Sequence, residues 1–129
     1  MSFRTIAVIT SAVALLLGLA YLFLGATVVG RWQILPTDSV LLLARRIGCL
    51  YLGLSLMYFL ARSAPPSVAR TALAAGSALA LSLLAICGVY ELTAGHAGPG
   101  IMVSAAVEFL IALGFGSVLV AERRTAARG

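Results

Sequence analysis

Four long apolar stretches restrict what this chain can fold into. They cover residues 6–29, 40–61, 71–92 and 100–121. Each reaches the roughly 20 residues that a helix needs to cross a bilayer core about 30 Å thick. Because the links between them are short, neighbouring helices are expected to pack antiparallel. The sequence therefore predicts an all-α fold: one integral membrane domain over residues 1–129, an antiparallel bundle of four transmembrane helices.

The composition favours the same class of protein. Hydrophobic residues make up 62% of the 129 positions and charged residues only 10%, whereas a soluble domain is roughly 45–50% apolar. The first stretch follows Arg4 as the core of a signal peptide would, but a signal core is only about 7–15 residues long. The stretch is therefore predicted to remain in the protein as an uncleaved helix.

The arginines predict the orientation. If the chain crosses four times, one side of the membrane carries Arg4, Arg62, Arg70, Arg123, Arg124 and Arg128, and the other carries Arg31. By the positive-inside rule, the N and C termini are then both cytoplasmic. The richness in arginine and alanine favours a bacterial source, so the predicted location is a bacterial inner membrane. The net charge of +5 is explained as a topology signal, and the expected surroundings are membrane lipids, not nucleic acid.

Apart from Glu91 at the end of the third stretch, three charges fall inside the apolar stretches: Arg45 and Arg46 in the second, and Glu108 in the fourth. At about 1.5 Å of helical rise per residue, the arginines lie roughly 8 to 9 Å below the outer boundary and Glu108 roughly 12 Å below it. An unpaired charge at that depth costs a few kcal/mol. We therefore predict that Glu108 pairs with one arginine, while the other reaches toward the outer head groups. Which arginine pairs is left open, and a ligand or proton site at these residues is the alternative.

Other polar side chains are predicted at a similar level, among them Tyr21, Tyr51 and Ser104. An apolar cavity with a few convergent polar groups is typical of a ligand site, whereas tyrosines near a boundary are also ordinary residues of the aromatic belt. A cavity open to the outer leaflet would suit an amphiphile such as a quinone or a lipid. His96 lies in a glycine-rich link, and the sequence assigns it no role.

The two halves of the chain share one spacing. Pro36 precedes Arg45 by nine residues, and Pro99 precedes Glu108 by nine. Two helical hairpins related by an axis along the membrane normal would have this spacing, and so could two unrelated hairpins by chance.

Familiar catalytic motifs do not occur in the sequence. It contains no HExxH, GxSxG or P-loop pattern. Cys49 and Cys87 have no metal-ligand spacing, and we expect them to be buried as small apolar residues. The sequence therefore favours a protein that is not an enzyme and leaves the cofactor unassigned, with a quinone or a lipid as candidates.

Residues 43–62, "LARRIGCLYLGLSLMYFLAR", resemble the R-x-x-G-x-x-x-x-x-G signature of small bacterial four-helix membrane proteins in the broad DoxX-like group, many of them uncharacterised. Arg45 and Gly48 match its first two positions, and Gly53 falls in its glycine-rich second turn. Glu108 is similar to the acidic residue often seen in the last helix of this group. The resemblance implies the four-helix fold, and no activity is carried over from it.

Three functions remain open from the sequence. The first is an accessory or interaction subunit without catalytic activity, bound to a larger membrane complex or in a homo-oligomer. The second is a binder or carrier of an amphiphilic ligand at the outer cavity near Arg45 and Glu108, with Arg45 or Arg46 holding the polar head. The third is a small oligomeric transporter or channel that depends on Glu108.

Overall fold

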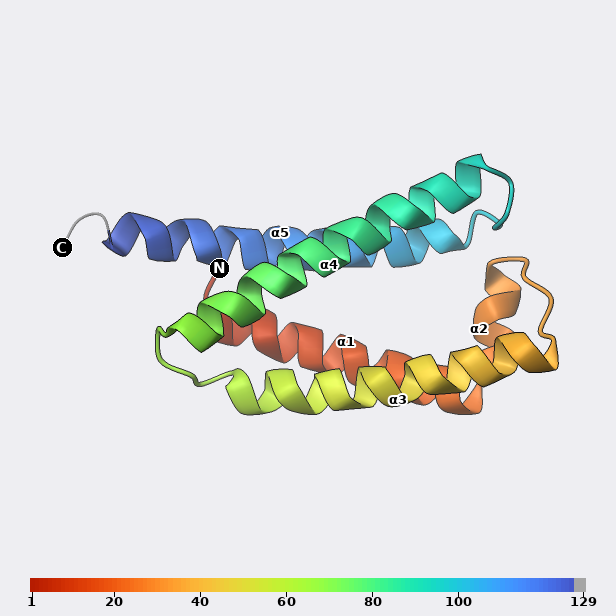
Figure 1. Ribbon diagram of the computed structural model, residues 1–129, viewed down its shortest axis with the longest axis horizontal. Helices are drawn as coiled ribbons and strands as arrows, with labels where there is room; N and C mark the ends of the chain where they lie inside the picture. The colour runs from red at the N-terminus through yellow and green to blue at the C-terminus, as the bar shows by residue number, and fades with distance from the viewer. Residues whose placement is uncertain (127–129) are drawn as a thin grey trace.

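The computed structural model describes residues 1–126 of the chain and is all-helical (Figure 1). These residues form five helices and no strand: α1 (Phe3–Phe23), α2 (Gly25–Arg31), α3 (Asp38–Ala61), α4 (Val68–Thr93) and α5 (Ile101–Ala126). All except α2 are long and apolar enough to cross a membrane. Arg128, predicted to be cytoplasmic, lies outside the described residues.

The stretch predicted as one helix over residues 6–29 forms two. The backbone leaves the helical conformation at Leu24, with φ −124° and ψ 27°, and Gly25 begins α2. A Cβ atom at Gly25 would lie 3.5 Å from the Cβ atom of Ala44 on α3, so the chain turns close to the neighbouring helix. With seven residues, α2 is too short to cross a bilayer.

The long helices pack as two pairs, α1 with α3 and α4 with α5. In the first pair, Gly18 lies against Gly48, where a Cβ atom would come within 2.9 Å of the Gly18 carbonyl oxygen. Glycine at these positions lets the two backbones approach closely, as helix contacts in membranes require. The hydroxyls of Ser11 and Ser55 also donate to each other's backbone carbonyls, at 2.8 and 2.9 Å. Each pair consists of long helices that are neighbours in the sequence.

The apolar core that joins the two pairs lies near the beginnings of α1 and α4 and the ends of α3 and α5. We call this region the core end. Its buried residues are Phe3, Ile6, Ala7, Tyr58, Ala74, Ile111, Phe115 and Val118. The ring of Phe115, which is fully buried, lies 6.5 Å from the ring of Phe3 and 5.7 Å from that of Tyr58. In Figure 1 the pairs are closest here and spread apart toward α2.

At the opposite end, which we call the loop end, the links that follow α2 and α4 touch. The N–H of Gly98 donates to the carbonyl oxygen of Trp32 at 2.6 Å. A Cβ atom at Gly100 would overlap the carbonyl oxygen of Arg31, so this approach requires glycine. The contact between the links ties the two pairs together where their helices have spread apart.

Candidate functional site

A cavity of about 330 Å³ lies between the two helix pairs. Residues from α1, α3, α4, α5 and the link after α2 line it, and most of them are apolar. Its polar and aromatic lining includes Thr10, Tyr21, Trp32, Tyr51, Ser104 and Glu108. Four sequence-predicted site residues, Tyr21, Tyr51, Ser104 and Glu108, are thus brought to one place. A largely apolar hollow with a few convergent polar groups is the usual form of a small-molecule site.

Aromatic rings form one wall of the cavity. The rings of Tyr21 on α1 and Tyr51 on α3 are stacked, with centroids 5.9 Å apart and planes 10° apart. Trp32 meets Tyr21 edge-on at 6.3 Å. The close packing of α1 on α3 at Gly18 and Gly48 brings the two tyrosines together, because each lies three residues beyond one of these glycines. The rings present extended apolar surface while their polar atoms remain available to a bound molecule.

Glu108 and Ser104 belong to the opposite wall. They are four residues apart on α5, so they share one face of this helix, and both side chains are half-buried. Within residues 1–126, ion pairs join only Arg70 to Glu122 and His96 to Glu91, and no hydrogen bond reaches the carboxylate of Glu108. The cavity therefore contains a carboxylate without a partner among these residues.

Thr10 adds a second unpartnered polar group. The residue is only 6% exposed, and its Oγ1 atom is buried without a hydrogen-bond partner among the described residues. A buried hydroxyl in that condition loses free energy that a hydrogen bond would recover. Sequence reasoning missed Thr10 because a threonine inside an apolar helix carries no motif.

The predicted ion pair between Glu108 and an arginine does not form. The buried face of α3 contains Ala44, Gly48, Ser55 and Tyr58 and packs on α1. Arg45 and Arg46 are exposed, and neither lines the cavity. Arg45 instead borders a separate hollow of about 170 Å³ beside Tyr21 and Gly25. Helical rise predicts the three charges at one level, but the main neighbour of α3 is α1 and that of α5 is α4.

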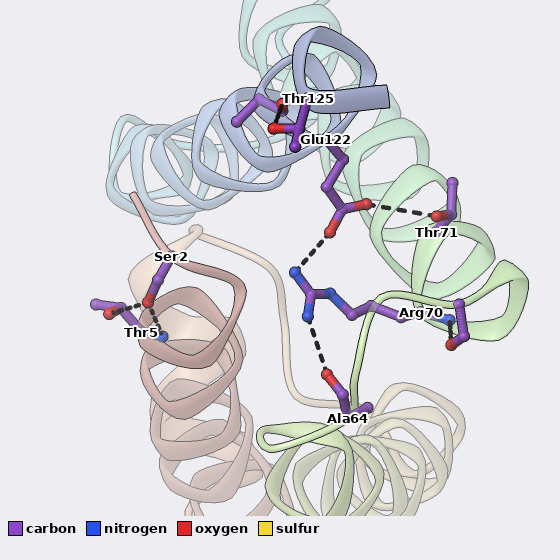
Figure 2. A network of polar contacts seen from close by, with 9 residues as sticks. Ser2, Thr5, Ala64, Arg70, Thr71, Glu122 and Thr125 are labelled. Atoms are coloured by element: carbon purple, nitrogen blue, oxygen red, sulfur yellow. Dashed lines mark hydrogen bonds and ion pairs between the residues drawn. The ribbon is translucent and has the colours of Figure 1, made fainter. Parts of the chain in front are cut away.

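The ion pair that does join two long helices is at the core end (Figure 2). Arg70 on α4 lies 2.6 Å from the carboxylate of Glu122 on α5, and the two side chains are only 16% and 23% exposed. The guanidinium also donates to the carbonyl oxygen of Ala64 at 2.9 Å and lies 4.7 Å from the ring centre of Phe3. Thr71 donates to the other oxygen of Glu122 at 3.4 Å. We call these five residues the clamp.

One sequence pattern could have indicated the ion pair of the clamp. Glu122 is an acidic residue next to two arginines at the end of an apolar stretch, and Arg70 begins another stretch at the same end. Treating Arg70 only as a topology signal left Glu122 unexplained. A carboxylate and a guanidinium at the same end of two neighbouring helices can bind with two parallel hydrogen bonds.

His96 and the cysteines lie apart from these contacts. His96 is exposed, and its Nδ1 atom is 2.9 Å from the carboxylate of Glu91. Cys49 and Cys87 are exposed, so the expectation that they are buried was wrong: the buried faces of α3 and α4 pass through the neighbouring Gly48 and Gly88 instead. Within residues 1–126, no group of three His, Cys, Asp or Glu residues could hold a metal ion.

Three wider hollows, of about 580, 650 and 410 Å³, lie along α4 and α5. The first is lined mainly by small and apolar residues such as Ala112 and Gly116, and the second adjoins Arg70 and Glu122, which already bind each other. The cavity between the pairs differs from all three because it combines an apolar lining with a carboxylate that has no ion-pair partner within residues 1–126. It is the best candidate site in the described part of the chain.

No protein-family model, curated protein or solved structure matches this chain.

Proposed function

We propose that this chain is a bacterial inner-membrane protein that holds an amphiphilic molecule in the cavity between its helix pairs. The membrane part of the proposal rests on four helices of sufficient length and apolarity. It also rests on the many large apolar side chains that are exposed along them, such as Leu16, Leu50 and Phe109. Such side chains suit contact with lipid tails, since they would be costly to expose to water.

The proposed orientation is an antiparallel bundle with both termini in the cytoplasm. α1 and α4 begin, and α3 and α5 end, at the core end (Figure 1), which carries Arg4, Arg62, Arg70, Arg123 and Arg124. Arg31 is at the loop end. This distribution fits the positive-inside rule with the core end in the cytoplasm, and the cavity would then lie toward the outer leaflet.

The single observation that carries the proposed activity is the composition of the cavity. Its apolar walls suit a hydrocarbon or aromatic body, while Ser104 and Glu108 offer hydrogen-bonding atoms that no other residue within 1–126 uses. Arg45 and Arg46 do not line the cavity, so the proposal does not have either arginine hold the polar head of the ligand. The accessory-subunit and oligomeric-transporter hypotheses both require a second chain. Binding of a ligand in the cavity requires only one chain. The DoxX-like resemblance stays a prediction.

Native mass spectrometry after mild extraction tests the proposal. We expect the wild-type chain to retain a discrete small molecule, and Ser104→Phe, which fills part of the cavity, to lose it. Arg45→Ala is the matched control, because this residue lies on the same membrane level but outside the cavity, and it should keep the molecule. Retention of nothing by the wild type, or equal retention by Ser104→Phe, would contradict the proposal.

A further inference from the structure

The charge balance of the cavity limits the head group that it can accept. Of the residues within 1–126 that line it, Glu108 is the only charged one, and none is basic. An anionic head group would face a carboxylate and find no cation. A carboxylate in an apolar membrane site is unfavourable unless a cation or hydrogen-bond donors accompany it. A positive charge on the ligand would supply the ionic partner that Glu108 lacks among residues 1–126.

The aromatic wall points to the same chemistry. Tyr21, Tyr51 and Trp32 surround one part of the cavity, and Tyr21 is only 6% exposed. The face of an aromatic ring carries negative potential, and it attracts ammonium groups most strongly where water is excluded. Rings that line the same cavity as a carboxylate are how proteins recognise organic cations such as quaternary ammonium groups.

We propose that the cavity binds a lipophilic cation, an organic ammonium or phosphonium group attached to an apolar body. This rests on the proposed function, since it specifies the ligand class of the same site. The charged group would lie near Glu108 and the aromatic wall. The apolar body would extend along Val13, Leu17, Leu54 and Ile111, which line the rest of the cavity.

Three phenyl-rich probes of different charge test this selectivity. They are the tetraphenylphosphonium cation, the tetraphenylborate anion and uncharged triphenylphosphine oxide. Binding is measured by isothermal titration calorimetry on the wild-type protein in nanodiscs of zwitterionic lipid, and the heat measured with empty nanodiscs is subtracted. We expect saturable binding of the phosphonium, and affinities for the other two probes that are at least about tenfold weaker, because both lack the charge that Glu108 attracts.

Variants identify the residue responsible. Glu108→Gln keeps the shape of the side chain and should weaken phosphonium binding by about tenfold or more. Glu91→Gln is the matched control: it makes the same change in a carboxylate outside the cavity and should leave binding unaltered. Trp32 is the only tryptophan, so a saturable change in its emission on adding phosphonium would locate the probe at the aromatic wall.

Each contrary result has one meaning. If the uncharged oxide binds as tightly as the phosphonium, or if Glu108→Gln leaves phosphonium binding unchanged, the cation inference is wrong while the cavity remains a binding site. Tighter binding of the borate overturns the inference in the same way. If no probe binds saturably, the inference also fails, and retention of a molecule in native mass spectrometry then decides separately whether the proposed function survives.

Discussion

The core end and the cavity differ in whether their polar side chains have partners. At the core end, Arg70 and Glu122 bind each other, Tyr58 shares a hydrogen bond of 2.5 Å with Ser77, and the space between the pairs is filled by Phe115. In the cavity, the carboxylate of Glu108 has no partner within residues 1–126, and the space beside it is open.

This difference distinguishes polar groups that stabilise the fold from polar groups that are available to a ligand. Groups that already satisfy one another contribute to stability, and removing one of them leaves another buried and unpaired. Groups that are unsatisfied in the free protein cost stability, and they persist where a bound molecule can use them. Three substitutions examine this contrast through stability, from the largest expected effect to the smallest.

Phe115→Ala should be the most damaging change. It removes a fully buried ring that contacts Phe3 and Tyr58 and joins the two pairs. Loss of a buried phenylalanine costs about 3–5 kcal/mol, and the unfolding temperature followed by circular dichroism in mild detergent should fall accordingly. Phe109→Ala, on the same helix but 52% exposed, serves as the control and should change that temperature little. Equal effects of the two would show that the core end does not hold the pairs together.

Arg70→Ala should have a smaller but clear effect. It breaks the clamp and leaves Glu122 largely buried without its cation, which costs about 2–4 kcal/mol in partly buried pairs. Arg123→Ala removes an exposed arginine next to Glu122 and is the matched control. Replacing both partners, as in Arg70→Met with Glu122→Leu, should recover much of the loss because no charge is then left unpaired. A double variant as unstable as Arg70→Ala would contradict this account of the clamp.

Glu108→Gln should leave stability unchanged within about 0.5 kcal/mol, or raise it slightly, because no ion pair or hydrogen bond of the described residues is lost. The same thermal measurement, made on protein freed of bound molecules, tests this. A loss as large as that of Arg70→Ala would mean that Glu108 has a structural partner, and the contrast between the two regions would disappear.

The fold was more accessible from the sequence than the site. Hydropathy located the four long helices, because a run of about 20 apolar residues has few alternatives. It did not locate the break at Leu24, since residues 25–29 continue the apolar run without a charged residue or a proline. Four of the residues that line the cavity were predicted as site residues: Tyr21, Tyr51, Ser104 and Glu108. The position of Arg45 outside the cavity was not predicted, because the depth of a residue along a helix does not say which neighbouring helix its side chain faces.

The division into two helix pairs also bears on how the chain is made. Each pair is formed by helices that follow each other closely in the sequence, and its main contacts are internal. In a protein of the membrane, as proposed above, the first pair could insert and pack while the second is still being synthesised, since insertion of membrane helices precedes their association. Docking through Phe115 and the clamp then requires the end of α5, so the cavity is completed only when the last helix has been translated.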